Sequence, residues 1–405
     1  MMGDIKFEVI KKIAETKFKY RDMGKISELD TNSPPSVFVG SKLKYPSVNV
    51  GILSPVERDE NAWVYDDAKY WAGNNFSIRD VMSLRDNLLN SRFQSKVTAS
   101  RSSGPDNKFI GIAQEIALAS KAVDVEIELA NKVGPGMKKD RVLMPQGMRG
   151  QLKKARITSN VKIHKKLDKV VNDELKAVAG IDYLYKNNFD EYTLSKILSV
   201  GVLGLKKNKK LVPTRWSITA TDDMLGKSLL ERVRSYKWIE DYELFLGEFM
   251  GNCYLIMMFP NVFSYELFEL YLPGSSWNPG KEIKASTDME TYGGRKTYAS
   301  ATAGGYYAAR LPILEYLDSV KRQATVLAIR IELPSYWASL GVWVVRESVR
   351  KALNNKKLKF RERSELIESA KKIGMIKFGF DPEKIIKKSK VFETIKTQTN
   401  LWKWV

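Results

Sequence analysis

Cysteine and histidine are almost absent from this chain of 405 residues, which contains one of each, Cys253 and His164. A single cysteine excludes an internal disulfide. One Cys and one His fall short of the four nitrogen and sulfur ligands of a usual zinc site, so we predict no metal and no cofactor. Cys253 lies in an apolar run, which favours a small buried side chain. His164 lies among lysines with no nucleophile adjacent in sequence, which favours a solvated or nucleic-acid-facing residue over a catalytic one.

Long apolar runs are missing as well. The longest candidate, Asn252 to Pro260, is far shorter than the roughly 20 residues that cross a bilayer, and it predicts a buried strand instead. The N-terminal stretch is charged throughout and lacks the apolar core of a signal peptide. We therefore expect a cytoplasmic protein that does not contact a membrane. Residues 1–30 are expected to form a charged leader of unassigned role.

Acidic residues are outnumbered, because 67 Lys and Arg stand against 47 Asp and Glu, a net charge of +20. A charge this far from zero opposes folding by self-repulsion, and binding to a polyanion is a common reason to retain it. The alternative is a generally basic protein with no nucleic-acid role. The charge is clustered in Lys138–Lys169 and Arg346–Lys390, with a short third cluster at Lys206–Lys210. Clustering predicts nucleic-acid binding through phosphates, with little sequence preference.

Alternating patterns of strand and helix indicate an α/β or α+β fold, with mixed sheets and packed helices, and they do not decide between the two classes. Residues 33–40 and 45–53 read as turns and strands. Helical patterns appear in six stretches, and two further apolar or alternating stretches predict strands. The predicted helices are 80–93 (capped by Ser77), 111–123, 223–236, 306–323 (with Pro312 in the first turn or kinking the helix), one that WASLGVWVVRESVRKAL (337–353) leads into, and 364–372, and the predicted strands are 123–133 and 324–333.

Composition divides the chain into two domains and a flexible C-terminal tail. A stretch rich in glycine and proline follows the predicted strand at 252–260 and suggests a change of domain near residue 280. The expected segments are the leader 1–30, an N-terminal domain 31–280 that contains the basic cluster 138–169, a basic C-terminal domain 281–390 and a tail 391–405.

The stretch 288–310 is the strongest candidate for a reaction or an anion site. Asp288 and Glu290 are the weak catalytic candidates, although Asp-x-Glu also fits a solvated turn. GGRK (293–296) could cradle a phosphate, and Gly304–Gly305 precedes a helix whose N-terminus favours anions. Tyr306, Tyr307 and Arg310 could stack on or clamp a base. The full set of predicted phosphate contacts is Lys153, Lys154, Arg156, Lys165, Lys166, Lys206, Lys207, Arg295, Lys296, Arg310, Lys356 and Lys357.

Five stretches in the same order resemble the archaeal Nre family of DNA repair proteins. They are SPPSVFVG (33–40), YPSVNVGIL (45–53), SITATDDMLGKSL (217–229), GGYYAARLPILEYL (304–317) and GVWVVRE (341–347). The resemblance runs from about residue 31 to the C-terminus. It implies an N-terminal and a C-terminal domain, a role in the repair of DNA damage, and contact with the DNA sliding clamp through a C-terminal peptide. Family members often carry a cysteine-rich, zinc-finger-like N-terminus, whereas residues 1–30 of this chain contain no cysteine.

The last residues, QTNLWKWV, fit the spacing of a clamp-binding (PIP) peptide. Gln398, Leu401 and Trp404 occupy the first, fourth and seventh positions, and Val405 occupies the eighth, where an aromatic residue is usual. A single helical turn places residues three apart on one side, so Leu401 and Trp404 would enter one apolar pocket. Residues before the peptide, such as Ile395, could pair with a clamp edge. The competing interpretation is that this tail packs into the protein's own core.

Two other functions remain open. One is an enzyme that acts on a nucleotide or on damaged DNA through residues 288–310. The other is an RNA-binding protein, which fits the charge equally well and leaves the C-terminal peptide without a role. We favour a DNA repair factor that binds damaged or branched DNA and is recruited by the sliding clamp without a catalytic step of its own.

Overall fold

The structure is a computed structural model that describes residues 27–42, 46–98, 108–131, 133 and 142–397. These residues pack into two compact units. The N-terminal unit extends to Leu225 and includes the segment Ser339–Gly341, and the C-terminal unit comprises Gly226–Ala338 and the chain from Val342 onwards. Helix α8 (Thr214–Val233) runs through this division. The change near residue 280 that composition suggests lies inside the C-terminal unit, and the domain limits stay a prediction.

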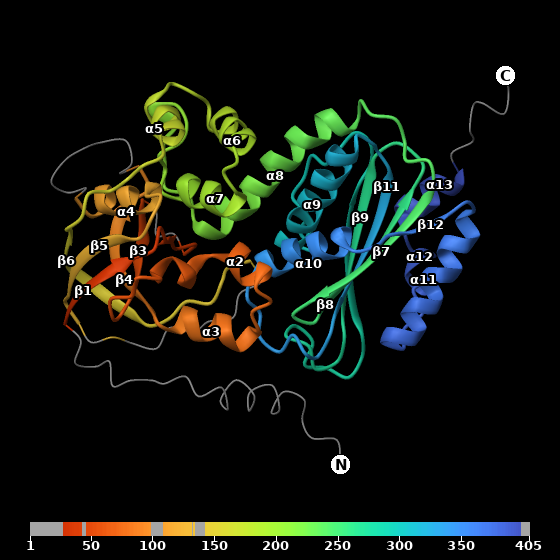
Figure 1. Cartoon of the computed structure of the whole chain (residues 1–405), viewed down its shortest axis with the longest axis horizontal. Coiled ribbons are helices and arrows are strands. Elements are labelled where there is room, and N and C mark those ends of the chain that lie inside the picture. Colours follow the sequence, from red (N-terminus) through yellow and green to blue (C-terminus); the bar gives the residue numbers. More distant parts are fainter. Residues whose placement is uncertain (1–26, 43–45, 99–107, 132, 134–141, 398–405) are drawn as a thin grey trace, which may run out of the picture. The chain divides into compact units, whose positions relative to one another are not determined.

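The N-terminal unit is built on a mixed six-stranded sheet in the order β1-β5-β6-β4-β3-β2 (Figure 1). Neighbouring strands are antiparallel, apart from the parallel pair β4 and β6. The strands are β1 (Glu28–Ser33), β2 (Val37–Val39), β3 (Ser47–Pro55), β4 (Leu88–Lys96), β5 (Val123–Leu129) and β6 (Arg149–Ile157).

Helices of the N-terminal unit pack on this sheet and on one another. Helix α4 contacts β2 and β6, α7 contacts α4 and β2, and α6 lies between α5 and α7. The helical segments are η2 (Ala62–Asp66), α2 (Ala68–Gly73), α3 (Ile78–Asp86), α4 (Lys108–Leu118), α5 (Lys165–Asn172), α6 (Ala177–Lys186), α7 (Glu191–Ser199) and η5 (Lys206–Asn208).

Helix α3 confirms one part of a sequence prediction and corrects the other. It begins at a capping box in which Ser77 and Asp80 exchange hydrogen bonds, as the predicted Ser77 cap requires. The helix predicted to continue to Phe93 ends at Asp86, and Leu88 opens strand β4. Leu88 and Leu89 are buried because β4 pairs with β3 and β6. Pairing between distant segments therefore outweighs the local helical spacing of the leucines.

The C-terminal unit contains a second mixed six-stranded sheet, in the order β10-β9-β11-β8-β7-β12. Only β9 and β11 are parallel. The predicted strands at 252–260 and 324–333 are confirmed as central strands, buried along their whole length. The strands are β7 (Tyr242–Phe249), β8 (Asn252–Phe259), β9 (Ser264–Tyr271), β10 (Lys284–Glu290), β11 (Thr325–Glu332) and β12 (Leu358–Phe360).

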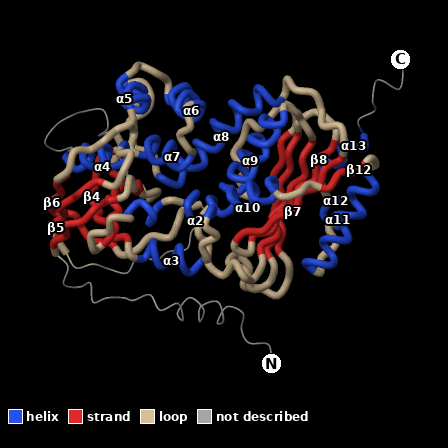
Figure 2. The backbone as a smooth tube through the Cα atoms, viewed as in Figure 1, coloured by secondary structure: helices blue, strands red, loops and turns tan. Residues whose placement is uncertain are grey.

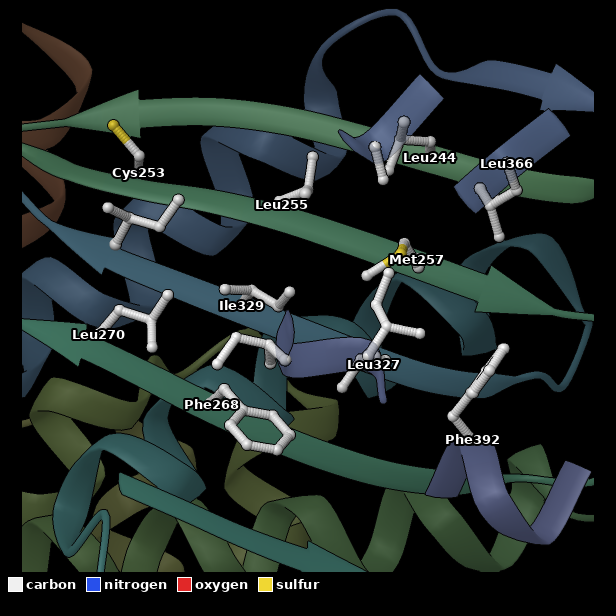
Figure 3. Close-up of a cluster of buried hydrophobic side chains, with 14 of the residues drawn as sticks. Leu244, Cys253, Leu255, Met257, Phe268, Leu270, Leu327, Ile329, Leu366 and Phe392 are labelled. Atoms are coloured by element: carbon white, nitrogen blue, oxygen red, sulfur yellow. The ribbon is translucent and has the colours of Figure 1, made fainter. Parts of the chain in front are cut away.

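The two faces of this second sheet differ in chemistry. Alternate residues of β8, β9 and β11 form an apolar core with α11 and α13, which includes Met257, Phe268 and Leu327 (Figure 3). Strand alternation directs the residues between them to the opposite face, where α9 and α10 pack. Figure 2 shows these helices along the strands of the C-terminal unit. The helices are α9 (Gly304–Val320), α10 (Val342–Asn354), α11 (Arg363–Phe378), α12 (Glu383–Ile386) and α13 (Lys390–Thr397).

Helix α13 is fixed to the sheet by an acidic residue. The Glu266 carboxylate of β9 accepts hydrogen bonds from the Ser389 hydroxyl at 2.5 Å and from the Val391 amide at 3.1 Å. A carboxylate at a helix N-terminus also compensates the positive end of the helix dipole. Phe392 and Ile395 then pack on the apolar core. The expected pairing of Ile395 with a clamp edge is therefore wrong for the chain in this conformation.

Two mixed sheets flanked by helices confirm the predicted α/β or α+β class with two units. The predicted helix at 306–323 is α9, and Pro312 lies inside that helix and not in its first turn. Cys253 is buried in the apolar core, as expected. In the described part of the chain, none of the helices is both long enough and apolar enough to cross a membrane. Residues 1–26 of the predicted leader 1–30 and the peptide 398–405 lie outside the described residues, and the last three residues of that leader belong to strand β1.

Candidate functional site

Asp288 and Glu290 lie on strand β10 and not in a solvated turn. A spacing of two residues directs both side chains to the same side of the strand. The Asp288 carboxylate accepts hydrogen bonds from Arg295 at 2.7 Å and from the backbone amide and hydroxyl of Thr302 at 2.8 and 2.9 Å. Asp288 therefore closes the segment between β10 and α9 into a fixed loop, with Arg295 from the GGRK stretch as its counter-ion.

Glu290 forms a buried ion pair with Arg310 of α9, at 2.8 Å between Oε1 and Nε, and the two side chains are 0% and 2% exposed. Tyr306 and Tyr307 of the same helix are also buried. The structure therefore places the three residues predicted to stack on or clamp a base in the interior. The aromatic side chains of this segment that face solvent are Tyr292 (45% exposed) and Tyr298 (53% exposed), which the sequence prediction missed.

A second charged network lies on the α9 side of the sheet. Arg330 of β11 contacts Glu269 at 2.6 Å, Glu332 at 3.0 Å and the Asn252 side chain at 2.9 Å. Tyr271 donates a hydrogen bond to Glu269 at 2.7 Å. Burial would lower the pKa of Arg330, but the two carboxylates raise that pKa well above its usual value and keep the guanidinium charged. Burial raises the pKa of Glu332, and the nearby charge of Arg330 offsets part of this increase.

Gly305, the second residue of α9, has a packing role. A Cβ atom on Gly305 would stand 2.5 Å from Glu269 Oε1, closer than real Cβ atoms approach any neighbour. The Glu269 carboxylate therefore lies beside the first turn of α9, where its charge disfavours an external anion. Burial also raises the pKa of Tyr306, so its phenol stays neutral. These buried side chains therefore stabilise the C-terminal unit from its interior, and none of them faces solvent.

The predicted phosphate contacts divide into neutralised and exposed cations. On β6, Lys153 and Lys154 both contact Glu128 of β5, and Arg156 contacts Glu126 at 2.8 Å. Lys357 contacts Glu243, and Arg295 and Arg310 are paired as described above. Lys153, Lys154 and Arg156 are exposed despite these contacts, and the other exposed cations of the set are Lys165 and Lys166 on α5, Lys206 on η5, Lys296 and Lys356. The side chain of Lys207, residues 138–141 and the clamp-binding candidates Gln398, Leu401, Trp404 and Val405 lie outside the described residues.

Helix α5 is the clearest basic surface. Leu167 and Val170 are buried beneath it, whereas Lys165, Lys166 and Lys169 are exposed. His164 caps this helix, and its Nδ1 accepts a hydrogen bond from the Lys166 amide at 3.2 Å. His164 is therefore an exposed structural cap. Within the described residues, His, Cys, Asp and Glu side chains do not gather in groups of three or more that could hold a metal ion.

The N-terminal unit contains a cleft of about 720 Å³ that sequence reasoning missed. Its walls come from η2, α2, the end of α4, and the starts of α5 and α7. Asp66 lies at its base, with contacts to Arg85 Nη1 at 2.5 Å and to Lys196 Nζ at 2.8 Å. The Ser36 hydroxyl, from the stretch SPPSVFVG, also hydrogen-bonds this carboxylate. Because the lining residues come from distant segments, no local spacing in the sequence could indicate this site.

Comparison with known proteins identifies two family models that together match nearly all of the chain. The model described as archaeal Nre, N-terminal, matches residues 1–278, and the model described as archaeal Nre, C-terminal, matches residues 290–404. No solved structure was found to be similar to the chain.

Three relatives share its sequence over most of their length. A protein named DNA repair protein NreA from Haloferax volcanii is 40% identical over 323 residues, which cover 78% of this chain and 76% of the relative. A protein of the same name from Archaeoglobus fulgidus is 39% identical over 342 residues, 84% of each chain. DNA repair protein NreB from Archaeoglobus fulgidus is 34% identical over 330 residues, 81% of each chain.

Proposed function

This chain belongs to the archaeal Nre family, and from that premise we propose that it is a DNA repair factor that binds DNA through basic surfaces and is recruited to the DNA sliding clamp by its C-terminal peptide QTNLWKWV. The names of its relatives support the repair role, which fits the resemblance noted in the sequence. We place the protein in the cytoplasm, in keeping with its charged N-terminal stretch.

Binding to DNA is supported by the net charge of +20 and by the exposed lysines of α5. Contacts of lysine with phosphate release counterions, so affinity should fall steeply as the salt concentration rises. Such contacts position a protein on DNA without specifying a sequence. We therefore expect preference for damaged or branched DNA to come from shape and from unpaired bases.

One observation supports recruitment by the clamp, namely that the peptide follows directly on a helix of the C-terminal unit. Helix α13 is docked on the C-terminal unit through Glu266, and the peptide begins at residue 398, directly after that helix ends. Burial of Trp404 would contribute about 5 kcal/mol, and burial of Leu401 about 2 kcal/mol. Ordering the peptide costs about 2–5 kcal/mol, and loss of translational freedom costs more. Binding of about micromolar strength is expected, since Val405 replaces the usual aromatic residue.

The two tryptophans of the peptide provide the test. Trp404 occupies an anchor position of the pattern and Trp402 a free position, so Trp404→Ala should abolish binding to the purified clamp, whereas Trp402→Ala should largely spare it. Isothermal titration with the full-length variants measures both affinities. Equal effects of the two substitutions would refute the predicted register. Deletion of residues 398–405 that leaves clamp binding unchanged would refute recruitment, and deletion that prevents folding would favour packing of the tail in the core.

An enzyme that acts on damaged DNA is the alternative that the sequence leaves open. Asp288 and Glu290 are each paired with an arginine and buried, so neither carboxylate is presented to a substrate in this conformation. Incubation of the purified protein with nicked, gapped and flapped DNA, and with labelled NAD, tests for turnover. An RNA-binding role is tested by salt titrations against DNA and RNA of the same sequence and structure, in which tighter binding to RNA at every salt concentration would favour it.

A further inference from the structure

The cleft of the N-terminal unit has the size and construction of a ligand site. Its volume, about 720 Å³, lies within the range of about 300–1,000 Å³ for small-molecule pockets. Its base is rigid, because Arg85 and Lys196 hold the Asp66 carboxylate from two different helices, α3 and α7. Burial would raise the pKa of Asp66, but Lys196 and Arg85 outweigh burial and lower it, so the carboxylate is ionised at neutral pH.

The charges around the cleft disfavour a phosphate as the bound group. Three lysines and four acidic residues line it. They are Lys69, Lys121 and Lys196, and Glu60, Asp66, Asp67 and Asp190. The nearly balanced lining instead suits a neutral ligand that offers hydrogen-bond donors and acceptors. An ammonium group has three donors, and the contact with Asp66 occupies one of those on Lys196, which is 21% exposed.

The aromatic lining indicates a flat ligand. Trp63 lines the cleft and is 39% exposed, and its ring is steadied by an edge contact with Tyr70 at 4.8 Å between centroids. Phe189 and His164 line the cleft as a second edge-to-face pair at 5.1 Å. Indole faces bind nucleobases by stacking, and pockets that receive a base turned out of a duplex combine stacking with hydrogen bonds to the base edge.

We propose that this cleft binds a nucleobase, unpaired or turned out of the DNA, by stacking it on Trp63 and hydrogen-bonding its edge near Lys196 and Asp66. The inference rests on the proposed DNA function, to which it adds the group recognised. Phosphates of the same strand would stay outside the cleft, where the exposed lysines of α5 follow directly on His164. No bond is made or broken in this step.

Photocrosslinking of the full-length protein tests the proposal. DNA with 5-iododeoxyuridine at an unpaired position is bound, irradiated and digested, and the crosslinked peptide is identified by mass spectrometry. We expect a crosslink at Trp63 that Trp63→Ala removes. Trp216→Ala is the matched control, because Trp216 is 51% exposed in the same unit and is absent from the cleft lining. Crosslinks confined to other residues, such as Tyr292 or Tyr298, would overturn the proposal.

A second measurement separates failure of the cleft from failure of DNA binding. Fluorescence anisotropy on the same DNA reports overall affinity, and ligand-observed NMR with free adenosine and thymidine reports base binding without DNA. We expect Trp63→Ala to weaken nucleoside binding about five- to a hundredfold, the range of base–aromatic stacking, and Trp216→Ala to leave it unchanged. If DNA does not bind, the proposed function fails, but the nucleosides still test the cleft. If both variants bind nucleosides equally, or if no nucleoside binds, the proposal is refuted.

Discussion

At the scale of single residues, the C-terminal unit depends on charges that are buried and paired. Replacement of Arg310 by methionine should leave the Glu290 carboxylate without its counter-ion in the interior. Breaking a buried pair from one side costs about 3–5 kcal/mol, so the free energy of unfolding should fall by that amount. Urea denaturation followed by circular dichroism measures the change.

The double variant Glu290→Gln/Arg310→Met serves as the control for that prediction. It removes both charges, so much of the lost stability should return. A double variant as unstable as Arg310→Met alone would mean that the arginine acts through its packing and not through the ion pair. Both variants leave the exposed lysines of α5 unchanged, and their DNA binding should therefore match that of the wild-type protein while they are folded.

Asp318 gives the clearest dependence of stability on pH. Hydrogen bonding from Arg232, with help from Tyr236, outweighs burial and lowers the pKa of Asp318 from 3.8 to about 2. A carboxylate with a lowered folded-state pKa stabilises the protein above its unfolded pKa, and this stabilisation is lost as the pH falls towards 2. Asp318→Asn should therefore cost up to about 2 kcal/mol at pH 7 and at pH 5.

Urea unfolding at several pH values checks this prediction. The difference in free energy of unfolding between wild type and Asp318→Asn should be the same at pH 7 and 5 and should narrow below pH 4. A difference that stays constant down to pH 2.5 would show that ionisation of Asp318 does not contribute. The outcome concerns the contact between α8 and α9 within the C-terminal unit, because Arg232 and Asp318 lie on those two helices.

At the scale of secondary-structure elements, helix α13 contains Thr397, the last described residue before the proposed clamp-binding peptide. Glu266→Gln removes the charge that holds the first turn of α13 while preserving the shape of the side chain. Hydrogen bonds to charged groups contribute about 1.5–3 kcal/mol, so amide hydrogen exchange in α13 should accelerate at least about tenfold. Mass spectrometry of exchanged peptides measures this change. Glu393→Gln, an exposed substitution on α13, should have little effect, and equal acceleration in both variants would refute the capping role.

Elements whose local pattern of apolar residues fits only one kind of secondary structure could be predicted from the sequence. Strand β8 is a continuous apolar run because both of its faces are buried, and β5 alternates because only one of its faces is buried. Strand β4 was missed because Leu84 and Leu88 also fit a helix, and only pairing with β3 and β6 decides between the two. The local pattern is ambiguous there, and long-range pairing determines the outcome.

The candidate sites follow the same rule. The acidic pair on β10 was visible in the sequence, but Arg310, the partner of Glu290, lies on another element, so the burial of Glu290 could not be foreseen. The cleft brings together Trp63, His164 and Lys196 from three distant segments, which no spacing connects. Sequence patterns can indicate which residues carry chemistry, whereas their partners and exposure depend on the tertiary fold.

At the scale of the whole molecule, the exposed lysines differ in whether a carboxylate contacts them. Lys153 and Lys154 share the single Glu128 carboxylate, so only about one of their two charges is uncompensated. Lys165 and Lys166 are exposed on α5, where Lys166 contacts the neutral amide of Asn187. Net charge alone does not distinguish these two surfaces, and the structure does so through the partners of each lysine.

Two double variants of equal charge change test this distinction. Lys165→Gln/Lys166→Gln should weaken binding to a DNA duplex about tenfold at moderate salt and lower the slope of log affinity against log salt by about 1–2, as expected for the loss of one or two phosphate contacts. Lys153→Gln/Lys154→Gln removes the same formal charge but should have a smaller effect, because Glu128 already compensates one of the two charges. Anisotropy titrations from 50 to 200 mM salt, a range where phosphate contacts dominate, measure both slopes. Equal losses would mean that affinity for DNA depends only on the total charge of the protein, and a larger loss from the β6 variant would contradict the proposed DNA-binding surface on α5 and favour one on that sheet.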